Sequence, residues 1–83
     1  VVAFNVAEVC FNNQQLDEAQ KYYELASKIK PDWPDPILKL GYVFLNKNDI
    51  PRAIEYFEKF LKLEPQDSPR VARVQQILQA IKK

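Results

Sequence analysis

Apolar residues recur every three or four positions along most of the chain, with polar or charged residues between them. Ile37, Leu40 and Phe44 show this spacing, which puts their side chains on one face of a helix. The spacing continues over residues 50–63 and again over residues 71–81. A sheet would instead show apolar residues at alternate positions, and no such run of β-branched residues is present. The pattern therefore predicts an all-α protein.

Capping residues and prolines mark the helix boundaries in the middle of the chain. We expect Asp35 to cap one helix, with Pro36 at the first helical position, where a missing N–H group costs nothing. The polar stretch 46–49 ends that helix, and Asp49 caps a second helix that Pro65 ends. This part of the chain is therefore expected to form a helix pair.

The sequence matches itself when it is shifted by 34 residues. Identical residues then meet at several places, and conservative pairs meet between them. The identical pairs are Val9 with Val43, Asn12 with Asn46, Ala19 with Ala53, Tyr22 with Tyr56, Glu24 with Glu58, Lys28 with Lys62 and Pro31 with Pro65. The conservative pairs are Val6 with Leu40, Leu16 with Ile50, Tyr23 with Phe57 and Ile29 with Leu63. One helix pair is thus used twice, at residues 1–33 and 34–67.

Residues 68–83 are expected to form a fifth helix, which has no partner helix of its own. Ser68 is its predicted cap, and its apolar stripe runs through Val71, Val74, Leu78 and Ile81. A repeat array needs such a helix to cover its last apolar face, so we interpret it as a C-terminal cap at which the protein ends. The chain opens without Met, which indicates that it was cut from a longer protein.

The order Leu40–Gly41, Phe44, Ala53, Phe57, Pro65 resembles the signature of the tetratricopeptide repeat family, with Ile37 where that signature has Trp. The first unit matches more loosely, at Val6–Ala7, Cys10, Ala19, Tyr23, Ala26 and Pro31. The resemblance implies an α-solenoid, in which antiparallel helix pairs stack into a right-handed superhelix. One departure is Phe60, where the family usually keeps a small residue, and we expect Phe60 to pack against the last helix.

The same resemblance implies that the first helix of each unit lines a concave groove for a peptide or partner helix. Positions that lie off the packing stripe, taken at steps of 34, form columns of candidate contacts. The predicted partner-binding residues are Phe4, Asn5, Glu8, Leu38, Lys39, Tyr42, Leu45 and Arg73, with Phe11, Asn12 and Asn46 beside them. The column of Asn5, Lys39 and Arg73 offers donors for a carboxylate and partly resembles the family's carboxylate clamps, although Asp35 would repel such a ligand. Ordinary surface decoration is the alternative.

Two further features concern the surface. The i, i+4 spacing of Glu24 with Lys28, Glu55 with Lys59, and Glu58 with Lys62 predicts ion pairs on a solvated outer face, with a charged docking strip as the alternative. Trp33, which lies in the turn between the units, is expected to pack over their junction, with contact to a partner as the alternative.

The net charge and the residue content argue against several classes of function. The net charge of +1 gives no field that would attract nucleic acid, although Arg70, Arg73, Lys82 and Lys83 make the last helix basic. No apolar run is long enough to span a membrane. With no histidine and only Cys10 as a thiol, we expect neither a metal or cofactor site nor catalysis, and we place Cys10 in the core. The compartment stays open, with the cytoplasm as the default.

The sequence thus predicts a scaffold or adaptor module that binds a protein or peptide without catalysing a reaction. One alternative is a purely structural segment of a larger array, and another is a regulatory segment of an enzyme whose catalytic domain lies elsewhere. The positions of Val2 and Val9 correspond to Pro36 and Val43, which should face the preceding unit. Since nothing in the chain covers Val2 and Val9, we also expect self-association through this N-terminal edge.

Overall fold

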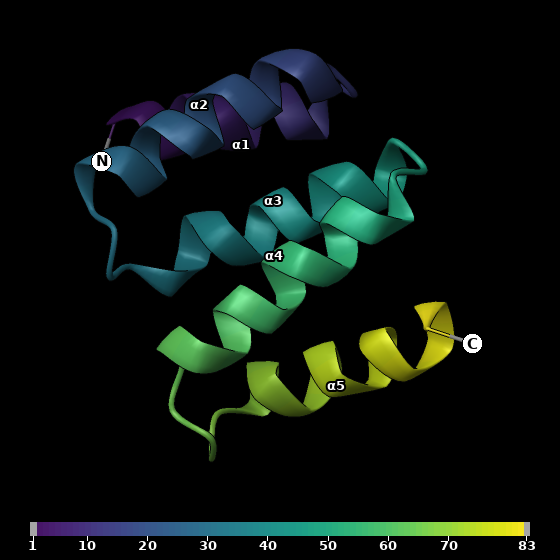
Figure 1. Ribbon diagram of the computed structural model, residues 1–83. Coiled ribbons are helices and arrows are strands. Elements are labelled where there is room, and N and C mark those ends of the chain that lie inside the picture. The colour runs from purple at the N-terminus through teal and green to yellow at the C-terminus, as the bar shows by residue number, and fades with distance from the viewer. Residues whose placement is uncertain (1, 83) are drawn as a thin grey trace.

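The computed structural model describes residues 2–82, which form five helices and no strand (Figure 1). The helices are α1 (Val2–Asn12), α2 (Leu16–Ile29), α3 (Pro34–Asn46), α4 (Ile50–Leu63) and α5 (Pro69–Ile81). The predicted all-α class is therefore confirmed. Helices α1 and α2 form one pair, α3 and α4 form a second, and α5 packs on α4 (Figure 1).

The period of 34 residues is visible in the turns inside each pair. Gln14 and Asn48, one period apart, both have a left-handed backbone, with φ of 66° and 65°. A hydrogen bond follows each of them: the N–H of Gln15 donates to the carbonyl of Cys10 at 2.8 Å, and the N–H of Asp49 donates to that of Phe44 at 2.9 Å. The two pairs are thus the same unit in backbone geometry as well as in sequence.

The predicted caps of the fourth and fifth helices are confirmed. Asp49 accepts a hydrogen bond from the N–H of Arg52 at 3.4 Å, and the Ser68 hydroxyl accepts one from the N–H of Arg70 at 3.2 Å. Each bond satisfies a backbone donor that has no partner inside its helix.

The predicted cap of the third helix is wrong. This helix begins at Pro34, with Trp33 in an extended conformation as its N-cap residue. Pro34 suits the first helical position because its ring sets φ and no N–H is needed there. Asp35 instead lies in the first turn of the helix, where its carboxylate pairs with Arg70 at 2.9 Å.

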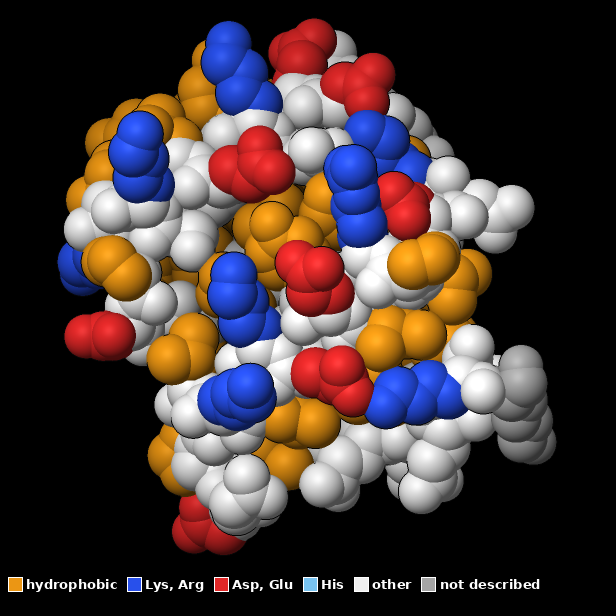
Figure 2. Space-filling view, in the orientation of Figure 1, with side chains coloured by type: hydrophobic (Ala, Val, Ile, Leu, Met, Phe, Trp, Pro, Cys, Tyr) orange, Lys and Arg blue, Asp and Glu red, His pale blue; other side chains and the backbone are white. Residues whose placement is uncertain are grey.

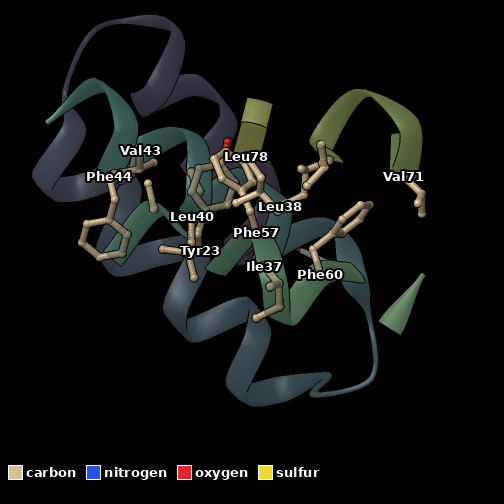
Figure 3. Packing of buried hydrophobic residues seen from close by; sticks show 14 of the residues in the cluster. Tyr23, Ile37, Leu38, Leu40, Val43, Phe44, Phe57, Phe60, Val71 and Leu78 are labelled. Atoms are coloured by element: carbon tan, nitrogen blue, oxygen red, sulfur yellow. The ribbon is translucent and has the colours of Figure 1, made fainter. Parts of the chain in front are cut away.

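Small residues let the helices of a pair approach closely. Ala7, Ala19 and Ala53 are fully buried, and Gly41 lies directly against the ring of Phe57. Around these contacts a single buried cluster runs through all five helices (Figure 3). The largest fully buried side chains in the cluster are Tyr23, Phe57, Phe60, Leu40, Val43 and Val74.

Phe60 and Arg70 help to attach α5 to the rest of the fold. Phe60 is fully buried in the same cluster as Val71 and Val74 of α5, which confirms its predicted packing. Arg70 lies 5.4 Å from the Phe60 ring and donates from Nε to the Glu64 carboxylate at 2.8 Å. Because Arg70 also pairs with Asp35, a single guanidinium joins the start of α3, the end of α4 and the start of α5.

The outer face is solvated, as predicted, because both members of each i, i+4 pair are exposed. None of the three ion pairs that the spacing favours forms within residues 2–82, and Glu58 instead pairs with Lys82, just after α5, at 2.6 Å. Lys47, which follows the end of α3, also reaches back to the first pair, where it contacts Asp17 at 2.5 Å and Gln20 at 2.9 Å. Long side chains therefore connect helices here rather than successive turns of one helix.

Candidate functional site

The predicted partner-binding residues lie on α1, α3 and α5, the first helices of the successive units. We call the surface formed by Glu8 of α1 with Lys39, Tyr42 and Leu45 of α3 the first-helix face. All four side chains are partly exposed. Leu38 is the exception among the predicted residues, because it is only 6% exposed and belongs to the buried cluster with Phe57 and Leu78 (Figure 3). Its assignment to a partner-binding surface is therefore wrong.

A polar group of three residues forms the centre of the first-helix face. The buried Tyr23 of α2 donates a hydrogen bond from its hydroxyl to Oε1 of Glu8, and Nζ of Lys39 lies 3.7 Å from the same oxygen. Burial raises the pKa of the Tyr23 phenol, and Glu8 raises it further, so Tyr23 stays protonated as a donor. Nothing in the sequence indicated this contact, because it depends on how α1 packs against the fully buried Tyr23 of α2.

The column of Asn5, Lys39 and Arg73 does not act as three free donors. Lys39 is already engaged by Glu8, whose Oε1 lies 3.7 Å from its Nζ. Asn5 and Arg73 are exposed. Asp35, which was expected to repel an acidic ligand, is compensated by Arg70. A ligand carboxylate at this column would therefore have to compete with Glu8 for Lys39.

Aromatic residues flank this polar centre on the side of the inter-unit turn. The half-buried ring of Phe4 lies 4.7 Å from Trp33 and 5.6 Å from Tyr23. Trp33 thus packs over the junction between the units, as predicted, and Nζ of Lys30 lies 5.6 Å from its ring. Phe4 is part of this packing, so only its outer edge is open to a partner.

The other end of the first-helix face holds a small cleft. This cleft of about 220 Å³ is lined by Phe11, Asn12, Gln14, Leu16 and Asn46. An Asn side chain both donates and accepts hydrogen bonds, so Asn12 and Asn46 can bind a peptide backbone. Asn46 already donates to the backbone carbonyl of Tyr42 at 2.8 Å.

Tyr42 and Leu45 supply the apolar part of this face. The Tyr42 ring packs edge-on against Phe57 at 5.4 Å, which fixes its orientation, and Leu45 packs against the same core. The face therefore combines apolar side chains held by the core with polar groups around them, as protein-binding surfaces do.

The described residues show neither a metal centre nor a membrane helix. No group of three metal-ligating side chains comes together within residues 2–82. Each helix in this part of the chain is too short or too polar to cross a bilayer. Cys10 is buried, as predicted.

Comparison with known protein families agrees with this architecture. A family model described as tetratricopeptide repeat matches residues 11–78, which is more than half of the chain. The chain belongs to the tetratricopeptide repeat family. Repeats of this family generally mediate protein–protein interactions. A search among curated proteins finds no match to this sequence.

In this tetratricopeptide repeat protein the exposed large apolar side chains gather on the first unit. They are Val2, Val6, Val9, Leu25 and Ile29, with Val2 78% and Val9 59% exposed. Leu40 and Val43, which lie one period after Val6 and Val9, are almost fully buried in the second unit. They are buried because α2 packs on α3, whereas no helix in the described residues packs on α1 in that way.

Proposed function

We propose that this chain is a scaffold or adaptor module that binds a peptide or a partner helix along its first-helix face, and that it acts without catalysis. The observation that carries this proposal is the combination of Tyr42 and Leu45, held by the core, with the polar group of Glu8, Lys39 and Tyr23. We also propose that residues 1–33 and 34–67 act as two repeats and residues 68–83 as their cap.

The chemistry of this face favours a partner that contributes both apolar side chains and hydrogen bonds. A large apolar side chain can pack on Tyr42, and the cleft beside Asn12 and Asn46 can take a backbone amide. The Glu8 carboxylate also disfavours a strongly acidic partner here, because it occupies Lys39.

The proposal can be tested with peptides that are selected from a displayed random library for binding to the full chain. We expect selected peptides to change the amide chemical shifts of Glu8, Lys39 and Tyr42. The Tyr42→Ala variant should lower their affinity by about 1 to 3 kcal/mol, as aromatic contacts of this kind do. Lys39→Glu should also weaken binding, because a new carboxylate beside Glu8 disrupts the polar group.

Tyr22→Ala is the matched control, because Tyr22 is a half-buried tyrosine of α2 that carries Lys21 over its ring. Thermal melts of each variant show whether its fold is retained, which matters because Tyr42 packs on Phe57. Unchanged affinity in both Tyr42→Ala and Lys39→Glu, with the folds intact, would contradict the proposal.

A structural role within a larger assembly is the second candidate, and one observation favours it. The apolar edge around Val2 and Val9 has the composition of a surface that packs on another helix. Sedimentation across a concentration series tests this role separately, since self-association concerns the N-terminal edge and not the first-helix face.

A further inference from the structure

The outer side of the molecule carries a cleft that the proposed first-helix face does not use. It lies between α2 and α4, with α3 as its floor, and has a volume of about 430 Å³. An adjoining cleft of about 320 Å³ shares Ser27, Pro31, Ile37 and Lys59 with it, so the two form one continuous groove. Figure 2 shows a hollow with hydrophobic side chains at its base, bordered by basic and acidic side chains. We call this groove the outer groove.

The floor of the outer groove is apolar and rigid. Ile37 and Leu40 of α3 form it and are 4% and 1% exposed, so the core holds them in place. Pro31 and Leu63 extend it at the end nearest the inter-unit turn. A groove of this size and lining accepts a bulky apolar side chain.

The walls of the outer groove carry more positive than negative charge. Lys28, Lys59 and Lys62 line it, against the single carboxylate of Glu24. Within the described part of the chain none of these lysines takes part in an ion pair, since the i, i+4 pairs predicted for them do not form. Lys59 and Lys62 also line a neighbouring cleft together with Glu55 and Glu58. Of these two carboxylates, Glu58 is engaged by Lys82, so it competes less for the groove lysines.

Tyr56 adds a neutral hydrogen-bond donor to the same wall. Burial raises the pKa of its phenol, and the carboxylates of Glu24 and Glu55 raise it further, so the hydroxyl keeps its proton. Its ring stacks on Phe44 at 5.3 Å, and Nζ of Lys59 lies 5.3 Å from its centre. The groove thus offers the aromatic ring of Tyr56 and the ammonium group of Lys59 side by side.

We propose that the outer groove binds an acidic peptide segment whose large apolar side chain enters the groove while flanking carboxylates pair with Lys28, Lys59 and Lys62. Charge complementarity selects this occupant, because three lysines and one glutamate surround an apolar floor. The concave form favours a single inserted side chain over a flat membrane surface. The outer groove shares no lining residue with the first-helix face, so this inference does not rest on the function proposed for that face.

A fluorescently labelled peptide of sequence Glu-Asp-Leu-Phe-Asp-Glu tests the proposal against the full chain. We expect saturable binding that weakens with added salt, with amide shift changes at Ser27, Ile37 and Tyr56. Replacing Leu-Phe in the peptide by Ser-Ser should abolish binding, because the floor then receives no apolar side chain. The double variant Lys59→Glu with Lys62→Glu should lower the affinity by about tenfold or more.

The variant pair Lys21→Glu with Lys30→Glu is the matched control, because it makes the same change in net charge at exposed sites outside the groove. It should leave the affinity within about twofold. Ser27→Trp fills the groove without changing charge and should also block binding. Melting curves of every variant are compared with the parent so that loss of fold is recognised.

Three results would overturn the proposal. The first is an affinity unchanged by both the lysine double variant and Ser27→Trp, with their folds intact. The second is a set of shift changes at Glu8, Lys39 and Tyr42, which would place the acidic peptide on the first-helix face. The third is lysine-dependent binding to vesicles of phosphatidylcholine and phosphatidylserine with none to the peptide, which would assign the groove to an anionic membrane surface.

Discussion

Gly41 of α3 lies against the ring of Phe57 of α4 so closely that a methyl group at position 41 would come within 2.6 Å of the ring. Phe57 is fully buried, so its ring has no free space into which it could move. One period earlier the corresponding residues are Ala7 and Tyr23, so only the second pair leaves out the methyl group. This contact explains why a glycine is kept in the middle of a helix, where it costs about 1 kcal/mol relative to alanine.

Gly41→Leu should therefore lower the free energy of unfolding by about 1 to 3 kcal/mol, because it overpacks the contact with Phe57. Gly41→Ala should lose less, since its gain in helix propensity offsets part of the clash. Thermal and urea melts measure both. Ala72→Leu, at an exposed position of α5, is the control and should be close to neutral. A Gly41→Leu variant as stable as the parent would contradict the close contact.

Leu40→Ala should cost about 2 to 5 kcal/mol, because it removes a side chain that is 1% exposed in the core. Val6 occupies the same position one period earlier but is 37% exposed. Val6→Ala should therefore cost well under 1 kcal/mol. Urea denaturation of the two variants checks the difference. Equal losses at the two positions would show that α1 is buried as deeply as α3.

Stability should fall in acid partly through Glu64. Hydrogen bonds from Arg70 and then from Ser68 lower the pKa of the Glu64 carboxyl in the folded state. As the pH falls, the Glu64 carboxyl of the unfolded state therefore takes up its proton first, at about pH 4.3. Between that pH and the lower pKa of the folded state, the contribution of the Glu64–Arg70 pair to the free energy of unfolding is lost. The contribution is fully present above this window. Glu64→Gln should remove it and flatten the acid limb of the stability curve.

At neutral pH, Glu64→Gln should lower the free energy of unfolding by only about 1 kcal/mol, because Arg70 is 41% exposed and solvent screens its pair with Glu64. Urea melts at a series of pH values measure both the size and the slope. Glu55→Gln is the control, since Glu55 lies on an exposed part of α4. If Glu64→Gln keeps the same dependence on pH as the parent, the junction of Arg70 with Glu64 does not stabilise the fold.

The N-terminal edge should make the chain associate with itself at high concentration. Val2 and Val9 are large, apolar and mostly exposed, so burying them against a second copy removes apolar surface from water. Sedimentation across a concentration series should show the parent associating and the double variant Val2→Lys with Val9→Lys remaining monomeric and helical. Asn12→Lys with Asn13→Lys adds the same charge at exposed polar positions and should associate like the parent. A parent that stays monomeric throughout would rule out this interface.

The helices, the repeat and most of the core follow from local patterns in the sequence. The apolar spacing of Ile37, Leu40 and Phe44 is a local property of the chain, and so are the caps Asp49 and Ser68. Residues one period apart adopt the same geometry, even at the left-handed Gln14 and Asn48. Such features depend on neighbours within a few positions, so a pattern in the sequence is sufficient to predict them.

The contacts between surface residues depend instead on how the helices pack. Leu38 is assigned by its position to the exposed first-helix face but is buried in the core cluster. Arg70 bridges Asp35 and Glu64 and so connects three helices. Lys39 of α3 likewise contacts Glu8 of α1, on a different helix. The distances between these groups depend on how far the helices tilt and slide against one another, and long side chains accept several partners within that range. Periodicity fixes the face of a helix on which a residue lies, but it does not specify what lies opposite that face.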